Sequence, residues 1–488
     1  MPERKMLGVF SEMANKVKER NAQRKRAKTI GDRAIRTEFV PDEFFRLPPL
    51  RDAHPKEEKP LFLAKLKYCS HLYSFESKDP QTVRKRNNKS ETVMELAEYA
   101  KASNLIFDEE ILPEFIETIK VNIITEIPEY DDDDDEIFKE PQFEHIGFFL
   151  NILALFMGNK HMNPKECKKY INTSFIDDLF KQLHHPDERI REGIKTIIHQ
   201  FYVKFVGHRT YIRKSMRNLI LTFAYEDESY RGIPHILQVL SSIVSGFSTP
   251  LKYEHKVLLL KVLLPLHAST KFTDFSSSMS FLMIQYAQKD PSLSAIILHS
   301  ILRTWPLANT PKELELLEEV EEILNNCDAD VFREVCLPLF KRLGKCMGSQ
   351  HYQVAERSLY FLNKTYILAL IEENIQQVMP AIVPELVQTA SNHWNHSIVL
   401  LVCELLRSLM ELDEDLFSDL VAELDQEAES TVSIDSLDRR STARKTIQAG
   451  MNRASDLKKR ESAASLSPNR NSGSKNDKYV RRSAGRQK

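Results

Sequence analysis

The chain has 488 residues, of which 42% are hydrophobic, 28% are charged and only 13 are glycine. So little glycine argues against a collagen-like chain, glycine-rich linkers and a β protein with many tight turns, and it favours helices. The formal net charge of −2 hides a basic segment at 1–36 (+7) and another at 439–488 (+12), so the residues between them carry −21. An acidic body disfavours nucleic acid as a specific partner.

Apolar residues recur at positions i, i+3, i+4 and i+7 from residue 61 to about 424, so we predict one helix after another. No stretch alternates with period two for long enough to predict a strand. Pro234, Pro291, Pro311 and Pro380 are expected at helix starts. The predicted helices are 61–73, 92–101, 148–157, 190–205, 211–225, 236–244, 256–264, 293–302, 312–324, 331–343, 353–367, 381–389 and 397–410.

Helices of 10 to 20 residues joined by short turns predict an all-α fold, a HEAT-like solenoid of helical hairpins. Segments 185–192 and 349–357 both resemble the start of the second helix of a HEAT repeat. Ile190 and Val354 are 164 residues apart, four times 41, which fits the HEAT period. A non-repetitive helical protein remains the alternative.

We predict three parts: a flexible basic segment at 1–40, the solenoid at 41–427 and a disordered basic tail at 428–488. The tail lacks the apolar surface that offsets the entropy of ordering. The acidic run Asp131–Asp135 is interpreted as a solvated loop, with an electrostatic docking patch as the alternative.

Motifs for chemistry are missing from the sequence. There is no glycine-rich nucleotide loop, no His-Glu-x-x-His and no kinase or serine-hydrolase signature. The six cysteines form no Cys-x-x-Cys pair and are expected to be reduced thiols. We therefore predict no catalytic residue, no metal and no cofactor.

The expected location is the cytoplasm, with nuclear entry through the basic ends as a further expectation. No secretory signal is recognised at the start of the chain. The longest apolar stretch, Ile146–Met157, is too short to span a bilayer, so no membrane span is predicted.

Several motifs resemble the B-prime regulatory subunits of protein phosphatase 2A. The strongest is PLKYEHKVLLLKVLLPLH at 250–267. The others keep the family's order: GHRTYIRK at 207–214, TPKE at 310–313, LEEVEEIL at 317–324, QVAERSL at 353–359 and HWN at 393–395. The resemblance covers about residues 44 to 420.

This resemblance implies a non-catalytic, HEAT-like subunit of a heterotrimeric phosphatase. The implied partners are an A-type scaffold subunit, a Ser/Thr phosphatase catalytic subunit and substrates. Substrates of this family carry a short motif of the form Leu-x-x-Ile-x-Glu, which binds in a groove of the solenoid. A generic HEAT-type scaffold or transport adaptor is the alternative function.

The resemblance also implies which residues line the groove. They are Thr196, His199, Gln200, Tyr202, Arg209, Val239, Ser242, Ile243, Lys252 and His255.

The residue types at these spacings suit an apolar peptide with one acidic side chain. Val239 and Ile243 are four apart on one helix face and can receive the motif's apolar side chains. His199 and Tyr202 share a face and can hydrogen-bond the peptide backbone. Lys252 and His255 are three apart and can hold the glutamate, whereas Arg209 can meet flanking acidic or phosphorylated residues.

The chain departs from the family at three places. Gln200 stands where the family usually has an arginine, and an amide has neither its charge nor its bidentate fork. Val239 is one methylene smaller than the usual isoleucine. Segment 81–89 is unlike the family, and we expect it to form a loop.

Overall fold

The computed structural model describes residues 47–130, 137–362 and 364–430, with side chains described to residue 426. Within these ranges the chain is helical and contains no strand, which confirms the predicted all-α fold. Residues 1–46 and 431–488 and the acidic run at 131–135 lie outside the described residues. The flexible segment, the disordered tail and the acidic loop therefore stay predictions.

Short 3-10 and π turns connect the α-helices at several points. The 3-10 turns are η2 (Leu50–Asp52), η3 (Leu105–Phe107), η4 (Val206–His208), η6 (Leu264–Ala268) and η7 (Phe272–Asp274), and η5 (Leu259–Leu263) is a π turn. The α-helices are α2 (Glu58–Cys69), α3 (Pro80–Ala102), α4 (Ile111–Ile123), α5 (Phe143–Gly158), α6 (Pro164–Cys167), α7 (Thr173–Gln182), α8 (Glu188–Lys204), α9 (Arg209–Tyr225), α10 (Ile233–Ser245), α11 (Tyr253–Leu258), α12 (Ser276–Lys289), α13 (Leu293–Arg303), α14 (Thr310–Leu324), α15 (Ala329–Met347), α16 (Tyr352–Leu362), α17 (Thr365–Glu373), α18 (Ile375–Asn392), α19 (His396–Leu412) and α20 (Glu414–Ser430).

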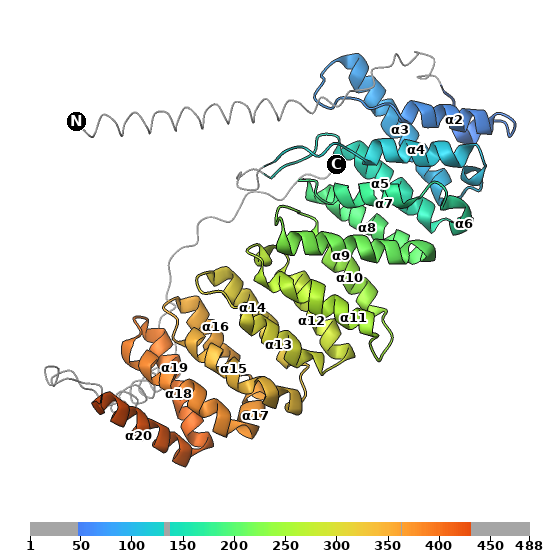
Figure 1. The fold of residues 1–488 in the computed structure, drawn as a ribbon. Coiled ribbons are helices and arrows are strands. Elements are labelled where there is room, and N and C mark those ends of the chain that lie inside the picture. Colours follow the sequence, from blue (N-terminus) through green and yellow to red (C-terminus); the bar gives the residue numbers. More distant parts are fainter. Residues whose placement is uncertain (1–46, 131–136, 363, 431–488) are drawn as a thin grey trace, which may run out of the picture. The chain divides into compact units, whose positions relative to one another are not determined.

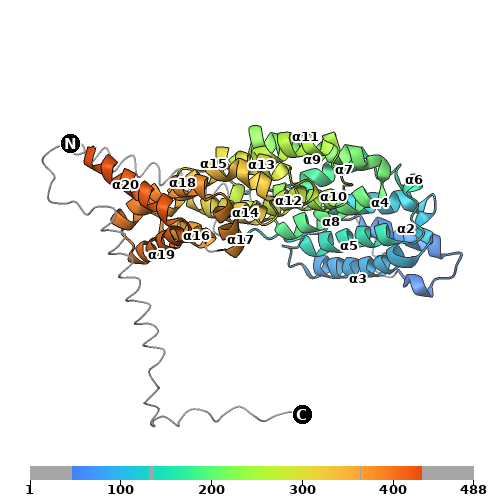
Figure 2. The same ribbon diagram turned by 90° about the horizontal axis from the view of Figure 1, so that it is seen from below.

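The helices up to Trp305 form one compact unit with two layers (Figures 1 and 2). In one layer α3, α5, α8, α10 and α12 pack side by side in chain order. The other layer holds α2, α4, α7, α9 and the segment from α11 to η6, and α13 packs against η6. Each hairpin thus adds one helix to each layer, the arrangement of a helical-repeat solenoid.

The second unit begins at Pro306 and repeats this arrangement. One layer holds α14, α16 and α19, and the other holds α15, α18 and α20. Both units therefore belong to the predicted class of helical-repeat solenoid.

Local sequence explains most helix starts. Asp187 accepts a hydrogen bond from the backbone N–H of Arg189 at the start of α8, and Asn309 caps α14 in the same way. Pro234 and Pro311 occupy the first turns of α10 and α14, as predicted.

The prediction for Pro380 is wrong, because Pro380 lies inside α18, which begins at Ile375. A proline there removes the hydrogen bond to the carbonyl four residues earlier. Both Pro380 and Gln376 are exposed, so water can satisfy that carbonyl. Pro291 lies in the turn before α13 rather than in its first turn.

Two further expectations also need correction. Segment 81–89 is not a loop but the first part of α3, where Asp79 caps the helix and Pro80 starts it. The predicted helix 256–264 is irregular: α11 ends at Leu258, and the π turn and a 3-10 turn follow. Pro265 has no backbone N–H, so a regular helix cannot pass through it unchanged.

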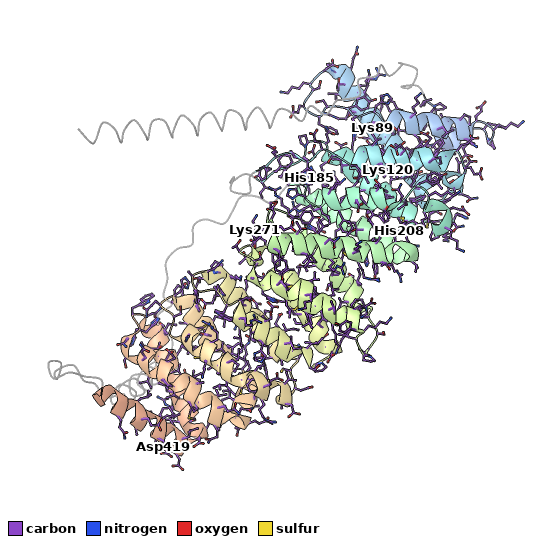
Figure 3. All side chains as sticks on the ribbon, in the orientation of Figure 1. Lys89, Lys120, His185, His208, Lys271 and Asp419 are labelled. Carbon is purple, nitrogen blue, oxygen red and sulfur yellow. The ribbon has the colours of Figure 1, made fainter. Side chains whose placement is uncertain are left out.

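A buried cation ties the first helices together. Lys89 on α3 is 0% exposed and is labelled in Figure 3. Its ammonium donates to the carbonyl of His71 (2.8 Å) and to Oδ1 of Asn122 on α4 (2.6 Å). It also lies 5.4 Å from the ring centroid of Phe149 on α5. The Asn122 amide donates in turn to the carbonyl of Cys69 (3.1 Å).

Among the described residues no helix is both long and apolar enough to cross a membrane. No cluster of three or more His, Cys, Asp or Glu side chains in that part of the chain could hold a metal ion.

Replacing Asn122 tests the buried network. Asn122→Ala removes the amide oxygen that accepts from the Lys89 ammonium and leaves that charge less well solvated. The expected loss is about 3 kcal/mol in the free energy of unfolding. Urea denaturation followed by circular dichroism measures it. Asn218→Ala, at an exposed position on α9, is the control and should change stability by less than about 0.5 kcal/mol. Equal effects of the two substitutions would contradict the role given to Asn122.

Candidate functional site

The ten residues implied by the sequence lie on α8, on α10 and on the segments that follow these helices. Helices α8 and α10 are neighbours in one layer of the first unit. Two polar contacts join their N-terminal halves: Nζ of Lys195 donates to Oε1 of Gln238 (2.6 Å), and Nε2 of His235 lies 3.5 Å from Oε1 of Glu192. We call the surface formed by the ten residues the α8–α10 face.

Helix α8 turns its apolar side chains inward and leaves polar ones on the face. Ile194 and Ile198 are fully buried, whereas Thr196 is exposed and His199 and Gln200 are half-buried. The Thr196 hydroxyl donates to the carbonyl of Glu192 (3.1 Å). The proton of this hydroxyl is thus already used within α8, so Thr196 has less to offer a ligand than the other three residues on α8.

The amide of Gln200 is incompletely satisfied. Its Oε1 atom is buried and accepts no hydrogen bond among the described residues. A buried acceptor without a donor costs free energy, so a ligand N–H that reaches it gains more than it would in water.

Helix α10 supplies an apolar floor. Val239 and Ile243 are 3% and 5% exposed. Both side chains are therefore almost covered, and a bound apolar side chain has to displace their neighbours to reach them. Ser242 is exposed, and its hydroxyl donates to the carbonyl of Gln238 (3.4 Å).

Arginine caps the C-terminal end of α8. Nε of Arg209 donates to the carbonyl of Tyr202 (2.9 Å), and its Nη2 donates to the carbonyl of Val203 (3.1 Å). The guanidinium also lies 5.4 Å from the centroid of the Tyr202 ring. A cation is favourable there because the last carbonyls of a helix carry negative partial charge. Two of the five N–H groups of Arg209 are thus used within the fold.

Arg213 is a further candidate residue that was not predicted from the sequence. Its Nη1 donates to the Tyr202 hydroxyl (3.0 Å), and its charge acts on His255. Arg213 therefore connects the end of α8 with the segment after α10. The sequence contained a sign of this role, because Arg213 lies four residues after Arg209 and therefore shares its helix face.

His255 lies at the cationic end of the face. Its ring stacks on Phe247 with centroids 3.5 Å apart and an angle of 3° between the planes. Burial lowers the pKa of His255, Glu254 opposes that shift, and the nearby charges of Lys252 and Arg213 lower the pKa further. Its Nδ1 atom is buried and has no hydrogen-bond partner among the described residues.

The cationic end is therefore suited to an anion. Lys252 is exposed, Arg213 is half-buried, and the neutral imidazole of His255 lies near both. A carboxylate placed there interacts favourably with two cations and favours the protonated form of His255. The Glu254 carboxylate, 3.6 Å from Nε2 of His255, opposes part of that attraction.

An open groove adjoins the face on the other side of α10. It has a volume of about 560 Å³ and lies between α10 and α12. Its lining residues are Gln238, Ser241, Ser242, Ser245, Ser277, Ser278, Phe281 and Gln285. We call it the serine groove. Ser242 belongs both to this groove and to the α8–α10 face.

The sequence matches a described family over most of its length. Residues 47–449 match the model of the protein phosphatase 2A regulatory B subunit, B56 family. The chain is 35% identical over 408 residues to the alpha isoform of the serine/threonine-protein phosphatase 2A 56 kDa regulatory subunit of Mus musculus, covering 83% of this chain and 84% of that protein. It is 36% identical over 385 residues to the beta isoform of Homo sapiens, covering 78% and 77%. These relatives are named as regulatory subunits, which confirms the predicted non-catalytic, regulatory role.

The pKa of His255 tests the described electrostatics. Lys252→Ala and Arg213→Ala each remove a positive charge that disfavours the imidazolium, so each should raise the pKa of His255. Glu254→Gln removes the charge that favours the imidazolium and should lower the pKa further. Histidine-detected NMR titration of the full chain measures these shifts. Lys204→Ala, an exposed position at the end of α8, is the control, and an equal shift in that variant would contradict the assignment.

Proposed function

The chain belongs to the B56 family of protein phosphatase 2A regulatory B subunits, and we propose that it recruits substrates through the α8–α10 face. The proposed ligand is an extended segment with two apolar side chains followed by a glutamate, of the Leu-x-x-Ile-x-Glu type. The observation that carries the proposal is the cationic end. There the backbone N–H of His255 donates to the Lys252 carbonyl (3.0 Å), and Arg213 donates to the Tyr202 hydroxyl (3.0 Å).

The apolar part of the ligand lies on α10. Val239 and Ile243 lie on adjacent turns of one helix. A peptide side chain that packs against them loses its contact with water, which is favourable. Because both side chains are almost covered, the side chains around them have to move when the ligand binds. Val239 gives this floor one methylene less than isoleucine does, which leaves more room for the incoming side chain.

The main chain of the ligand bonds to α8. The unpartnered Oε1 of Gln200 accepts a backbone N–H, and Nδ1 of His255 is a second polar atom whose bonding is completed on binding. An arginine cannot accept this bond, but it brings a charge and a fork of N–H donors for the carbonyls and carboxylates of a ligand. Gln200 lacks both, so we expect weaker binding than with an arginine at this position.

The glutamate of the ligand lies at the cationic end. Its carboxylate accepts from the exposed Lys252 ammonium, and the Arg213 guanidinium contributes charge from α9. Charge-assisted hydrogen bonds of this kind are about twice as strong as neutral ones.

The proposed partners are an A-type scaffold subunit and a Ser/Thr phosphatase catalytic subunit. Purification of the tagged full chain from extract should bring both subunits and Ser/Thr phosphatase activity with it. Recovery of the chain without phosphatase activity would favour a generic HEAT-type scaffold or adaptor instead.

Removing the Lys252 ammonium should weaken peptide binding. Lys252→Ala is expected to cost about 1.5–3 kcal/mol of binding free energy, or about a ten- to hundredfold loss of affinity. His255→Ala should act in the same direction with a smaller loss, because its imidazole is neutral at pH 7. Titration of a fluorescent Leu-x-x-Ile-x-Glu peptide against the full chain measures both.

Gln200→Arg is the complementary variant and should tighten binding by restoring a cation. Lys261→Ala serves as the control, because Lys261 is an exposed lysine outside the face. Assembly with the scaffold and catalytic subunits should be unchanged in all four variants. Unchanged affinity for folded Lys252→Ala and His255→Ala proteins would remove these residues from the site.

The binding should also depend on pH. The pKa of His255 lies below its ordinary value, so the imidazole is neutral at pH 7. A bound carboxylate favours the imidazolium and raises that pKa, so binding takes up a proton. Peptide affinity should therefore rise as the pH falls from 7.5 to 5.5, where a glutamate is still ionised. In His255→Ala this rise should disappear, and its persistence there would assign the proton to another group.

A further inference from the structure

The serine groove lies on the other side of α10 from α8, and one of its ends approaches the cationic end of the face. Nζ of Lys289 on α12 donates to the carbonyls of Ser245 (3.0 Å) and Phe247 (2.8 Å). The ring of Phe247 stacks on His255. The Tyr286 hydroxyl on α12 donates to the His255 carbonyl (3.3 Å), and Tyr286 is next to the groove residue Gln285. One end of the groove thus lies directly beside the position proposed for the ligand glutamate.

The lining of the groove suits a peptide main chain. It consists of hydroxyl and amide side chains and one aromatic ring, and none of its residues carries a charge. Hydroxyl and amide groups both donate and accept, as a peptide backbone does. Ser241 and Gln285 already bond across it (3.2 Å), which fixes the spacing of α10 and α12.

One side of the groove offers an apolar surface to a ligand. Phe281 is 57% exposed on α12, a large exposure for a phenylalanine. The stretch of α10 from Gln238 to Ser245 is about 10 Å long. That length matches about three residues of extended chain.

We propose that the serine groove binds the residues that directly follow the motif glutamate in the same partner chain. This proposal rests on the proposed function, because the glutamate at Lys252 and His255 sets where those residues begin. The bound segment is then extended by about three residues with uncharged side chains, its main chain bonded to the serines and its side chains packed on Phe281. The groove adds selectivity for the sequence after the motif.

Peptides of different length test the proposal on the full chain. The first is a six-residue Leu-x-x-Ile-x-Glu peptide. The second adds Ser-Ala-Ser-Gly after the glutamate, and the third adds the same four residues before the leucine. The second peptide should bind about fivefold more tightly than the first, and the third should show no gain.

Substitutions in the groove should remove that gain alone. Phe281→Ala changes an exposed side chain, so the fold should persist, and Ser278→Trp fills the groove. Both should bind the second peptide as weakly as the first and leave the affinity of the six-residue peptide unchanged. Tyr360→Ala, at an aromatic residue that is 48% exposed in the second unit, is the matched control and should keep the gain.

The outcomes separate the two proposals. If the six-residue peptide binds in a Lys252-dependent way and neither extension improves it, the groove proposal is overturned and the function stands. A gain in affinity from the extension before the leucine would likewise overturn the groove proposal and leave the proposed function standing. If no peptide binds the folded full chain, the proposed function fails and the extension fails with it.

Discussion

No hairpin of this chain can bury its apolar face alone. Helix α8 illustrates the constraint: Ile190 and Ile194 are fully buried because α5 packs on one side of α8 and α10 on the other. Each helix inside a layer therefore depends on the helices on both sides of it, as in other repeat proteins. The same constraint leaves one face of each layer outside the apolar core, and the polar residues of α8 and α10 lie on that face. Exposed residues such as Thr196 and Ser242 can therefore vary at little cost in stability, whereas Val239 and Ile243 are packed in the interior.

The helical class and most helix positions followed from the spacing of apolar residues, because that spacing is set by the need to bury one face. The spacing of apolar residues did not predict the local structure at two places. Pro380 looks like a helix start, yet α18 continues through it because the freed carbonyl faces water. Segment 81–89 was expected to be a loop because it is unlike the family, yet it is helical, and Lys89 is buried there through partners far along the chain. A pattern search cannot find partners of that kind.

The candidate site was predictable to a similar degree. The resemblance identified the ten residues, and the structure brings Tyr202 to Arg209 and places Lys252 near His255. It did not identify Arg213, whose role depends on how α9 lies against the end of α8. Nor did it reveal that Val239 and Ile243 are nearly covered, because exposure depends on neighbouring side chains. The serine groove could not be predicted from the sequence, because serines on two separate helices form no motif.

The two ends of the α8–α10 face are built on very different supports. The apolar floor belongs to α10, a helix packed along its length against α8 and α12. Lys252 and His255 belong to the start of α11, which has six residues and no buried side chain. Tyr286 holds that segment through the His255 carbonyl, and Asp290 holds it through Lys256 (2.6 Å). A segment held by few contacts opens more often than a packed helix. The cationic end of the face therefore opens and closes more readily than its apolar floor.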